Sequence, residues 1–280
     1  MKFQNKTAVV TGAGGTLCSV IAIHLAEQGA KVALVGRTAE KLEAVRAKIE
    51  AFGGICHVFP CDVGDPKAVE ELAAAVEAKF GPCSILVNGA GGNNVKAMPT
   101  VTQFDERELT HTMPEGQKGL ADIDLDAFRQ VLNTNTLGTV YPTLAFIGQM
   151  VKCGKGSVLN FASMNTYCPL TRCFAYAMSK AAVANLTQSM AAYYAPAHIR
   201  INAVAPGFMV NERSRAYLGT VESGLTARGE AVIRHTPMGR FGEAEDLLGC
   251  ADWLLDDEAA AFVTGITVPV DGGFLTLGGV

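Results

Sequence analysis

Residues 7–36 read "TAVVTGAGGTLCSVIAIHLAEQGAKVALVG", and this stretch decides the fold. The apolar runs at 7–10 and 31–36 are predicted strands, and the amphipathic segment between them is a predicted helix. A glycine-rich turn at 11–18 joins the first strand to this helix, at the place where a nucleotide phosphate would bind. The strict pattern G-x-G-x-x-G is broken, because Leu17 stands at its third glycine.

The alternation of strand and helix continues to the end of the chain. Short β-branched runs recur as "TAVVTG", "KVALVG", "CHVFPCDV", "CSILVNGAGG", "GSVLNFAS", "IRINAVAPG" and "GITVPVDGG". Most segments between them have the apolar spacing of helices, as Val69, Leu72, Ala73 and Val76 illustrate. Strands that are apolar on both faces and separated by helices form a parallel sheet covered on both sides. The sequence therefore predicts a doubly wound α/β fold in a single domain over 1–280.

The overall composition limits the classes of partner. Of the 280 residues, 49% are hydrophobic and 18% are charged, and the formal net charge is -4. This weakly acidic chain gives no electrostatic reason to expect nucleic acid or an anionic membrane as a partner. The 8 cysteines form no C-x-x-C pair and have no histidine at zinc-ligand spacing, so they are predicted to be reduced, in a cytoplasmic protein without a metal site. No apolar run reaches the roughly 20 residues of a membrane-spanning helix.

Ligands of doubly wound sheets bind beyond the carboxyl ends of the strands. The segments that end the predicted strands are residues 11–18, 36–38, 61–63, 88–94, 162–166 and 205–211. A long polar segment without helical or strand periodicity, about 93–122, interrupts the pattern before a helix predicted to begin near Asp124. Such a loop is predicted to be a lid or a binding segment, and the alternative is a surface insertion without a role.

Chemistry-bearing residues concentrate between 163 and 180. Tyr176 and Lys180 are four residues apart on a predicted helix and share a face. A lysine beside a phenol favours the phenolate and lowers the pKa of the tyrosine, which suits general acid–base chemistry. Ser163 ends a strand-like run and is placed to hydrogen-bond a substrate oxygen. Asn135 adds a polar side chain to an otherwise apolar helix, where its alternative roles are a kink or a bond to the backbone.

In this order the residues resemble the short-chain dehydrogenase/reductase family over nearly the whole chain. The matching features are the first glycine turn, Asp62 and Val63, "NGAG" at 88–91, Asn135, Ser163, Tyr176, Lys180, "PG" at 206–207 and "VDGG" at 270–273. The resemblance implies that Tyr176 exchanges a proton with the substrate oxygen while hydride passes between substrate and nicotinamide. It also implies that Ser163 holds that oxygen, that Lys180 lowers the pKa of Tyr176 and binds the ribose, and that Asn135 supports a water chain to Lys180.

The resemblance also implies a set of cofactor contacts. They are Gly12, Gly14, Gly15, Thr16, Leu17, Arg37, Asp62, Val63, Asn88, Ala90, Gly91, Tyr176, Lys180, Pro206 and Gly207. At the end of the second predicted strand, Gly36 stands where an acidic residue would favour NAD, and Arg37 follows it. This pair favours NADP(H) over NAD(H). The alternative is that Arg37 stacks on the adenine of NAD or lies in solvent.

The first glycine turn departs from the family pattern T-G-x-x-x-G-x-G. Thr16 and Cys18 stand where two glycines are expected, and Gly14 and Gly15 lie inside the loop instead. Cys18 is small enough for close packing of helix on strand. Thr16 is predicted to cap the helix, with the backbone N–H groups of Thr16 and Leu17 directed at the pyrophosphate.

Within the family, "NGAGGN", "APGFM", "HTPMGRFGE" and the long insertion resemble the branch of D-mannonate oxidoreductases. That resemblance implies reversible reduction of D-fructuronate to D-mannonate. Arg172 would bind the substrate carboxylate in two hydrogen bonds, and the segment at about 208–240 would close over the substrate. The expected substrate contacts are Asn93, Ser163, Asn165, Arg172 and Tyr176.

Other functions stay open at this point. The same fold and residues would serve a reductase of another polyol, a sugar or a 3-oxoacyl substrate. A non-catalytic dinucleotide-sensing protein is a second alternative, although it would be expected to lack Tyr176 or Lys180. Small residues along 176–195 permit close helix packing between subunits, and the family resemblance implies a homotetramer or homodimer; the alternative is that this face packs within one subunit.

Overall fold

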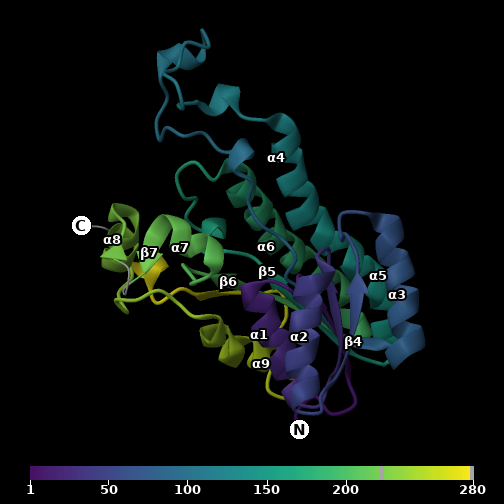
Figure 1. Cartoon of the computed structure of the whole chain (residues 1–280). Coiled ribbons are helices and arrows are strands. Elements are labelled where there is room, and N and C mark those ends of the chain that lie inside the picture. The colour runs from purple at the N-terminus through teal and green to yellow at the C-terminus, as the bar shows by residue number, and fades with distance from the viewer. Residues whose placement is uncertain (221–223, 278–280) are drawn as a thin grey trace.

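The computed structural model describes residues 1–220 and 224–277, and its centre is a seven-stranded sheet with helices on both faces (Figure 1). The strands are β1 (Thr7–Thr11), β2 (Lys31–Gly36), β3 (Ile55–Pro60), β4 (Cys83–Asn88), β5 (Gly156–Phe161), β6 (Ile199–Pro206) and β9 (Thr267–Val270). They lie in the order β3-β2-β1-β4-β5-β6-β9 and pair in parallel. The seven predicted strands and the doubly wound α/β fold are confirmed.

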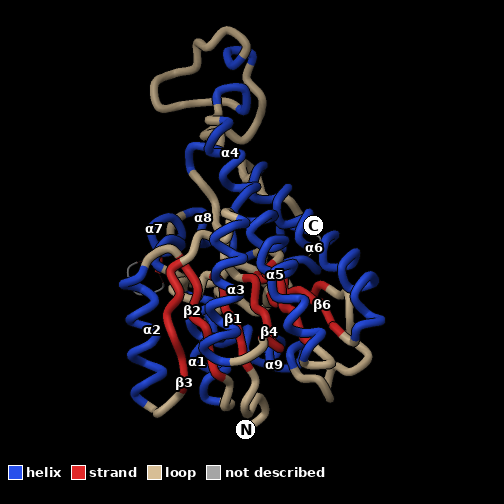
Figure 2. The backbone as a smooth tube through the Cα atoms, turned by 90° about the vertical axis from the view of Figure 1, so that its right-hand side faces the viewer, coloured by secondary structure: helices blue, strands red, loops and turns tan. Residues whose placement is uncertain are grey.

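The helices form two layers around the sheet (Figure 2). They are α1 (Thr16–Glu27), α2 (Ala39–Ala51), α3 (Pro66–Phe80), α4 (Leu125–Leu132), α5 (Gly138–Lys152), α6 (Phe174–Tyr194), α7 (Glu212–Leu218), α8 (Ala227–Arg234) and α9 (Leu248–Leu255). One apolar core joins the sheet to α1, α2 and α9, and a second joins its other face to α3, α5 and α6. Both faces of the sheet are buried, which explains why its strands are apolar without alternation.

Local sequence signals set the ends of α3. Its N-cap residue Asp65 accepts hydrogen bonds from the backbone N–H groups of Lys67 and Ala68, and Pro66 takes the first helical position, where no N–H is needed. The helix ends at Gly81, whose φ of 86° is a conformation that favours glycine. This helix carries its apolar residues at the spacing predicted from the sequence and buries them against the sheet.

The strand order reverses between β1 and β4. The chain runs outward from β1 to β2 and β3, then returns to place β4 on the other side of β1. The loops that follow β1 and β4 lie at this reversal, at the carboxyl edge of the sheet where doubly wound folds bind ligands, and this place is here called the crevice. Both loops are glycine-rich in this chain, so the crevice is lined by backbone.

Residues 93–122, here called the arm, project from the body of the molecule beyond the start of α4 (Figures 1 and 2). The arm contains the short turns η1 (Val95–Ala97), η2 (Glu106–Glu108) and η3 (Leu120–Asp122). Its centre is Glu108, which is 4% exposed and accepts hydrogen bonds from the N–H groups of Asp105 and Ala121. The predicted lack of regular structure is confirmed, as is the helix start near Asp124, which caps α4.

The region at 208–240, here called the α7–α8 segment, has its own small core. It contains α7, the short antiparallel strands β7 (Gly219–Thr220) and β8 (Gly224–Leu225), and α8, whereas residues 221–223 lie outside the described residues. Leu218, Val232 and Phe241 are buried together in it. The sequence did not predict this pair of strands.

Candidate active site

The two glycine-rich loops of the crevice are held together by a threonine hydroxyl and by close packing of their backbones. The Thr11 hydroxyl oxygen, at the end of β1, accepts hydrogen bonds from the N–H groups of Gly89 and Ala90, each at 3.1 Å. Gly12 has a φ of 70°, and a Cβ there would lie 2.9 Å from Cα of Ala90. Only glycine fits this close approach. The two loops therefore present peptide groups to the crevice, and this surface is here called the glycine floor.

The N-terminus of α1 differs in one detail from the sequence prediction. The N-cap is Gly15, which is extended, and its carbonyl accepts the N–H of Ser19 at 2.9 Å. Thr16 is the first helical residue, so the prediction that it caps α1 was wrong. A glycine can take the cap conformation without strain, and this moves the start of the helix one residue earlier. The N–H groups of Thr16 and Leu17 belong to the first turn, which has no intrahelical acceptors for them.

Cys18 replaces a family glycine, and the loop after β4 makes room for it. The side chain is 3% exposed, and a Cβ at Gly89 would lie 2.0 Å from its Sγ. The glycine lost from α1 is thus matched by a glycine in the facing loop. Burial raises the pKa of the Cys18 thiol to about 12, so this thiol is a packing group and not a nucleophile.

Asn135 lies in a π-helical turn, η4 (Asn133–Leu137), between α4 and α5, and is fully buried. Its Oδ1 accepts the N–H of Gly92 at 2.8 Å, and its Nδ2 donates to the Gly92 carbonyl and to Oγ of Ser179. Ser179 in turn donates to the carbonyl of Tyr176. The side chain thus fixes the loop after β4 to α6, and π-helical turns of this kind are frequent at functional sites.

Ser163, Tyr176 and Lys180 come together at the start of α6, as the sequence predicted. Ser163 follows β5, is 5% exposed and hydrogen-bonds Tyr176. Lys180 is also 5% exposed, and its Nζ lies 5.7 Å from the centroid of the Tyr176 ring and donates to the Phe161 carbonyl at 2.6 Å. A Cβ at Gly91 would lie 3.5 Å from that Nζ, so the lysine also faces the loop after β4.

Burial controls the protonation of this group. It raises the pKa of Tyr176, an effect that the Ser163 hydrogen bond opposes. It lowers the pKa of Lys180 to about 8. The lowered tyrosine pKa expected from the neighbouring lysine is not found in this arrangement, because desolvation of the phenolate outweighs the favourable contacts.

The predicted substrate contacts lie around this centre, but two of them already have partners. Asn165 donates to Oγ of Ser163 and accepts the N–H of Leu170, so it fixes the serine and the loop that follows. Arg172 donates to the Thr100 carbonyl at the base of the arm, at 3.1 Å. Asn93 is half-buried at the start of the arm. The contact of Asn165 with Ser163 is a positioning contact that the sequence did not predict.

At the other end of the crevice, Arg37 follows β2 and Asp62 follows β3. Nη1 of Arg37 lies 4.0 Å from Oδ2 of Asp62, and both side chains are exposed. Val63 is buried, and a Cβ at Gly138 would lie 2.7 Å from its Cγ2, so Val63 packs against the start of α5. A cation therefore lies beyond the end of β2, as predicted.

Two further predicted cofactor contacts, Asn88 and Gly207, lie at the carboxyl ends of β4 and β6. Nδ2 of Asn88 donates to Oγ1 of Thr143 and to Oδ1 of Asn160, each at 2.9 Å, which joins the end of β4 to α5 and β5. Gly207 follows Pro206 at the end of β6, and a Cβ there would lie 2.7 Å from Cα of Asp271. These residues shape the crevice through packing and backbone geometry.

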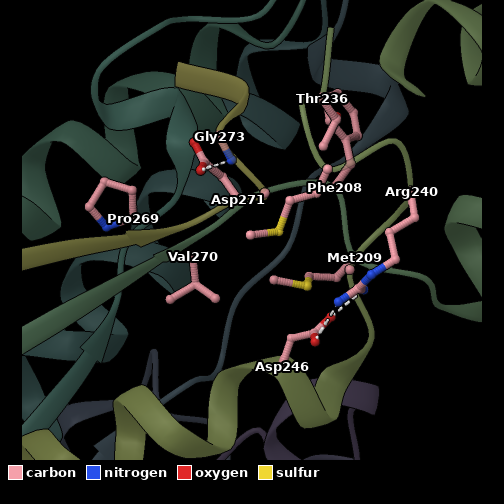
Figure 3. A pocket seen from close by; sticks show the side chains of 12 residues that line it. Phe208, Met209, Thr236, Arg240, Asp246, Pro269, Val270, Asp271 and Gly273 are labelled. Carbon is pink, nitrogen blue, oxygen red and sulfur yellow. Dashed lines mark hydrogen bonds and ion pairs between the residues drawn. The ribbon is translucent and has the colours of Figure 1, made fainter. Parts of the chain in front are cut away.

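A cavity of about 420 Å³ lies behind the Pro206–Gly207 turn and is distinct from this centre (Figure 3). Phe208 and Met209 form one wall, and Arg240, bound to Asp246 at 2.6 and 2.8 Å, forms another. Ser163, Tyr176 and Lys180 do not line it. This cavity is therefore separate from the cluster of Ser163, Tyr176 and Lys180.

The structure also adds residues to the site that the sequence did not predict. Tyr217, at the end of α7, lies near Tyr176 and contributes to the rise in its pKa. Arg228, in α8, stacks over the Tyr217 ring with its Cζ 5.7 Å from the ring centroid. Neither belongs to a motif, and only the spatial contact of α7 with α8 brings them to the centre. Asn211 caps α7, because its side chain accepts the N–H of Ser214.

Residues 1–220 and 224–277 contain no helix long and apolar enough to cross a membrane. Within the same ranges, no three His, Cys, Asp or Glu side chains gather as a metal site would require.

The family model of short chain dehydrogenases matches residues 6–218. The chain belongs to this family. It is 40% identical over 279 residues to an uncharacterized oxidoreductase of Haemophilus influenzae, covering 99% of this chain and 95% of that protein. It is also 40% identical over 275 residues to the uncharacterized oxidoreductase UxuB of Bacillus subtilis, covering 98% and 96%.

A solved structure extends the comparison. A protein of Haemophilus influenzae provisionally named a D-mannonate oxidoreductase, with bound NAD, is 38% identical and matches with a TM-score of 0.93 over 100% of this chain and 98% of that one. This short-chain dehydrogenase is therefore an NAD(P)-dependent oxidoreductase that acts on CH–OH groups. Its glycine floor and the free N–H groups at the start of α1 fit a dinucleotide pyrophosphate.

Proposed function

We propose that the enzyme interconverts the alcohol and ketone of a sugar acid, with D-mannonate and D-fructuronate as the pair. The Ser163–Tyr176 hydrogen bond beside the buried Lys180 carries this proposal, because it sets an acid–base group at the edge of the nucleotide crevice. The name of the solved Haemophilus influenzae relative supports the substrate. Retention of Tyr176 and Lys180 weighs against a non-catalytic dinucleotide-sensing protein.

The proposed roles of the side chains are those that the family resemblance implies. Tyr176 donates a proton to the substrate oxygen during reduction and accepts one during oxidation, and Ser163 holds that oxygen beside the phenol. Stabilisation of the phenolate by Lys180 stays the role predicted from the sequence, whereas burial raises the pKa of Tyr176 in this arrangement. Asn135 positions α6 against the loop after β4 through Gly92 and Ser179. A nicotinamide dinucleotide, when bound, supplies or accepts the hydride.

The residues that would hold this dinucleotide are those predicted from the sequence. They are Gly12, Gly14, Gly15, Thr16, Leu17, Arg37, Asp62, Val63, Asn88, Ala90, Gly91, Tyr176, Lys180, Pro206 and Gly207. Preference for NADP(H) over NAD(H) is part of the proposal. It rests on Gly36, which presents no carboxylate to a ribose, and on the exposed guanidinium of Arg37.

The substrate contacts also stay predictions. Asn93, Ser163, Asn165, Arg172 and Tyr176 surround the start of α6 or the base of the arm, and the α7–α8 segment is proposed to close over the substrate. Binding of the carboxylate by Arg172 would require its guanidinium to leave the Thr100 carbonyl. The arm would then change its contact with the body when substrate binds.

One assay tests the proposed reaction. The purified protein is mixed with NADPH or NADH and D-fructuronate, and oxidation of the nicotinamide is followed by its absorbance. We expect turnover of D-fructuronate, and D-mannonate as the product. Turnover of other sugars, polyols or 3-oxoacyl thioesters without turnover of D-fructuronate would contradict the substrate and retain the reaction type.

Two further expectations belong to the same proposal. Homotetramer or homodimer formation is expected from the family resemblance and is tested by sedimentation at several protein concentrations. A cytoplasmic location is expected for a protein whose 8 cysteines are all free, and this observation supports it.

A further inference from the structure

The start of α8 contacts the end of α7 through hydrogen bonds to backbone carbonyls. The N–H of Thr226 donates to the Leu218 carbonyl at 2.9 Å, and the Thr226 hydroxyl donates to the Tyr217 carbonyl at 2.8 Å. A Cβ at Gly229 would lie 2.0 Å from the Leu218 carbonyl oxygen, so the two segments touch there. Arg228 lies between Thr226 and Gly229, and its backbone is therefore held in place.

The Nε atom of Arg228 is buried and has no hydrogen-bond acceptor among the residues that the structure describes, although the residue as a whole is half-buried. Its guanidinium lies over the face of the Tyr217 ring, with Cζ 5.7 Å from the ring centroid. Arg234 on the same helix differs, because it is exposed and lies 3.7 Å from the Glu230 carboxylate. A buried arginine donor without an acceptor is costly unless a ligand completes it.

Arg228 faces the reaction centre. Burial raises the pKa of Cys173, and the charges of Arg228 and Arg172 oppose that rise, so both cations lie near this residue. Cys173 precedes α6 and is three residues from Tyr176, a spacing that puts the two side chains on one face of a helix. Tyr217, on which Arg228 stacks, also lies near Tyr176. Arg228 therefore lies next to Tyr217 and near Cys173, two residues that neighbour Tyr176.

We propose that Arg228 is the residue that binds the carboxylate of the substrate, with the Tyr217 ring as the surface that keeps its guanidinium planar and oriented. A carboxylate would supply the acceptor that Nε lacks, in the two-bond geometry that guanidinium groups favour. This inference rests on the proposed sugar-acid substrate. It assigns the role to Arg228 because Arg172 is already bound to the Thr100 carbonyl.

The experiment compares substrates that differ in one carboxylate. D-fructuronate and D-fructose differ in having a carboxylate or a CH₂OH group at the same end of the molecule. Steady-state kcat and KM are measured for both with wild type, Arg228→Met, Arg228→Lys and Arg172→Met. Arg234→Met is the matched control, since it removes an exposed arginine from the same helix.

We expect Arg228→Met to raise KM for D-fructuronate by about 30- to 100-fold, the size expected for loss of a charge-assisted hydrogen-bonded pair. Its kcat/KM for D-fructose should stay within about twofold, and Arg228→Lys should recover part of the loss with D-fructuronate. Arg172→Met should have the smaller effect. Unchanged nucleotide affinity and thermal unfolding midpoint show that the variant is folded.

The outcomes separate the two proposals. A wild-type enzyme that reduces D-fructuronate, with an Arg228→Met variant of unchanged KM, overturns the role of Arg228 and leaves the proposed function standing. Equal losses for D-fructuronate and D-fructose also overturn it, because they indicate a structural role. A wild-type enzyme that prefers D-fructose to D-fructuronate overturns both.

Discussion

The nucleotide crevice and the substrate side of this molecule are built in different ways. Backbone groups line the crevice, where Gly12 meets Ala90 and Gly89 makes room for Cys18. Side chains from distant segments make up the proposed substrate side, where Arg172 reaches Thr100 and Arg228 stacks on Tyr217. A backbone surface needs particular glycines at particular spacings, whereas a side-chain surface tolerates many residues. The first region can therefore be predicted from a sequence motif, whereas the residues of the second can be identified only from the three-dimensional structure.

The two regions meet at α6, so substitutions there should separate them most clearly. Tyr176→Phe removes the proton donor and keeps the ring, so we expect kcat to fall roughly 100- to 10,000-fold, the usual contribution of a general acid–base group. Nucleotide affinity, measured by fluorescence titration, should change little. Tyr193→Phe on the exposed side of the same helix is the control. Retained turnover in Tyr176→Phe would refute the assignment.

Lys180 offers a pH test at the same place. Burial lowers its pKa from 10.5 to about 8, whereas the unfolded chain keeps the ordinary value. Between these pH values the unfolded state binds more protons, so the free energy of unfolding should rise with pH. The full change is roughly 3 kcal/mol, from about 1.4 kcal/mol for each pH unit.

Lys180→Met removes this titration, and its unfolding free energy should lack the rise. Urea unfolding of both proteins at pH 7.5, 8.5 and 9.5 measures the difference. Comparison of the two proteins is needed because Cys18, with a pKa raised to about 12, acts in the opposite direction above pH 9. If the free energy of unfolding changed with pH in the same way for wild type and Lys180→Met, burial would not lower the pKa of Lys180.

The crevice itself can be tested through its glycine and cysteine. Gly89→Ala places a Cβ 2.0 Å from Sγ of Cys18, so we expect a loss of about 1–3 kcal/mol in the free energy of unfolding, and weaker nucleotide binding with it. Cys18→Ala in the same chain removes the 2.0 Å contact, because the new Cβ would then face the Thr11 carbonyl oxygen at 3.1 Å and Cβ of residue 18 at 3.5 Å. The double variant should be more stable than Gly89→Ala alone. Additive losses in a double-mutant cycle would show that the two residues do not pack as described.

The difference between the two regions also explains which features could be predicted from the sequence. The seven strands were predicted because each is a short β-branched run, and Ser163, Tyr176 and Lys180 because strand end and helix spacing place them together. The cap of α1 was assigned to Thr16 because hydroxyl residues are good caps, but Gly15 takes the cap conformation. The fit between Cys18 and Gly89 joins residues 71 positions apart and follows no periodic pattern.

The same reason accounts for what was missed on the substrate side. Arg228 and Tyr217 are eleven positions apart, on two short helices whose contact depends on Gly229 and Thr226. Nothing in the local sequence distinguishes Arg228 from the exposed arginines around it. Arg172 was singled out because it lies between Ser163 and Tyr176 in the sequence, yet its hydrogen bond goes to the base of the arm. The structure thus reduces the weight of sequence proximity as evidence for a substrate contact.

The smallest expected effect concerns Arg37 at the rim of the crevice, where a side chain and not the backbone is expected to determine the preference between NADPH and NADH. Arg37→Ala should raise KM for NADPH about tenfold or more, the size of one lost charge-assisted bond to a phosphate, and leave KM for NADH within about twofold. Its ion pair with Asp62 is long and exposed, so the free energy of unfolding should hardly change. Arg46→Ala, which removes an exposed arginine of α2 that is paired with Glu43, controls for loss of surface charge. Equal losses for both nucleotides would mean that Arg37 stacks on the adenine they share, and the rim would then recognise a common group, as the glycine floor is expected to do.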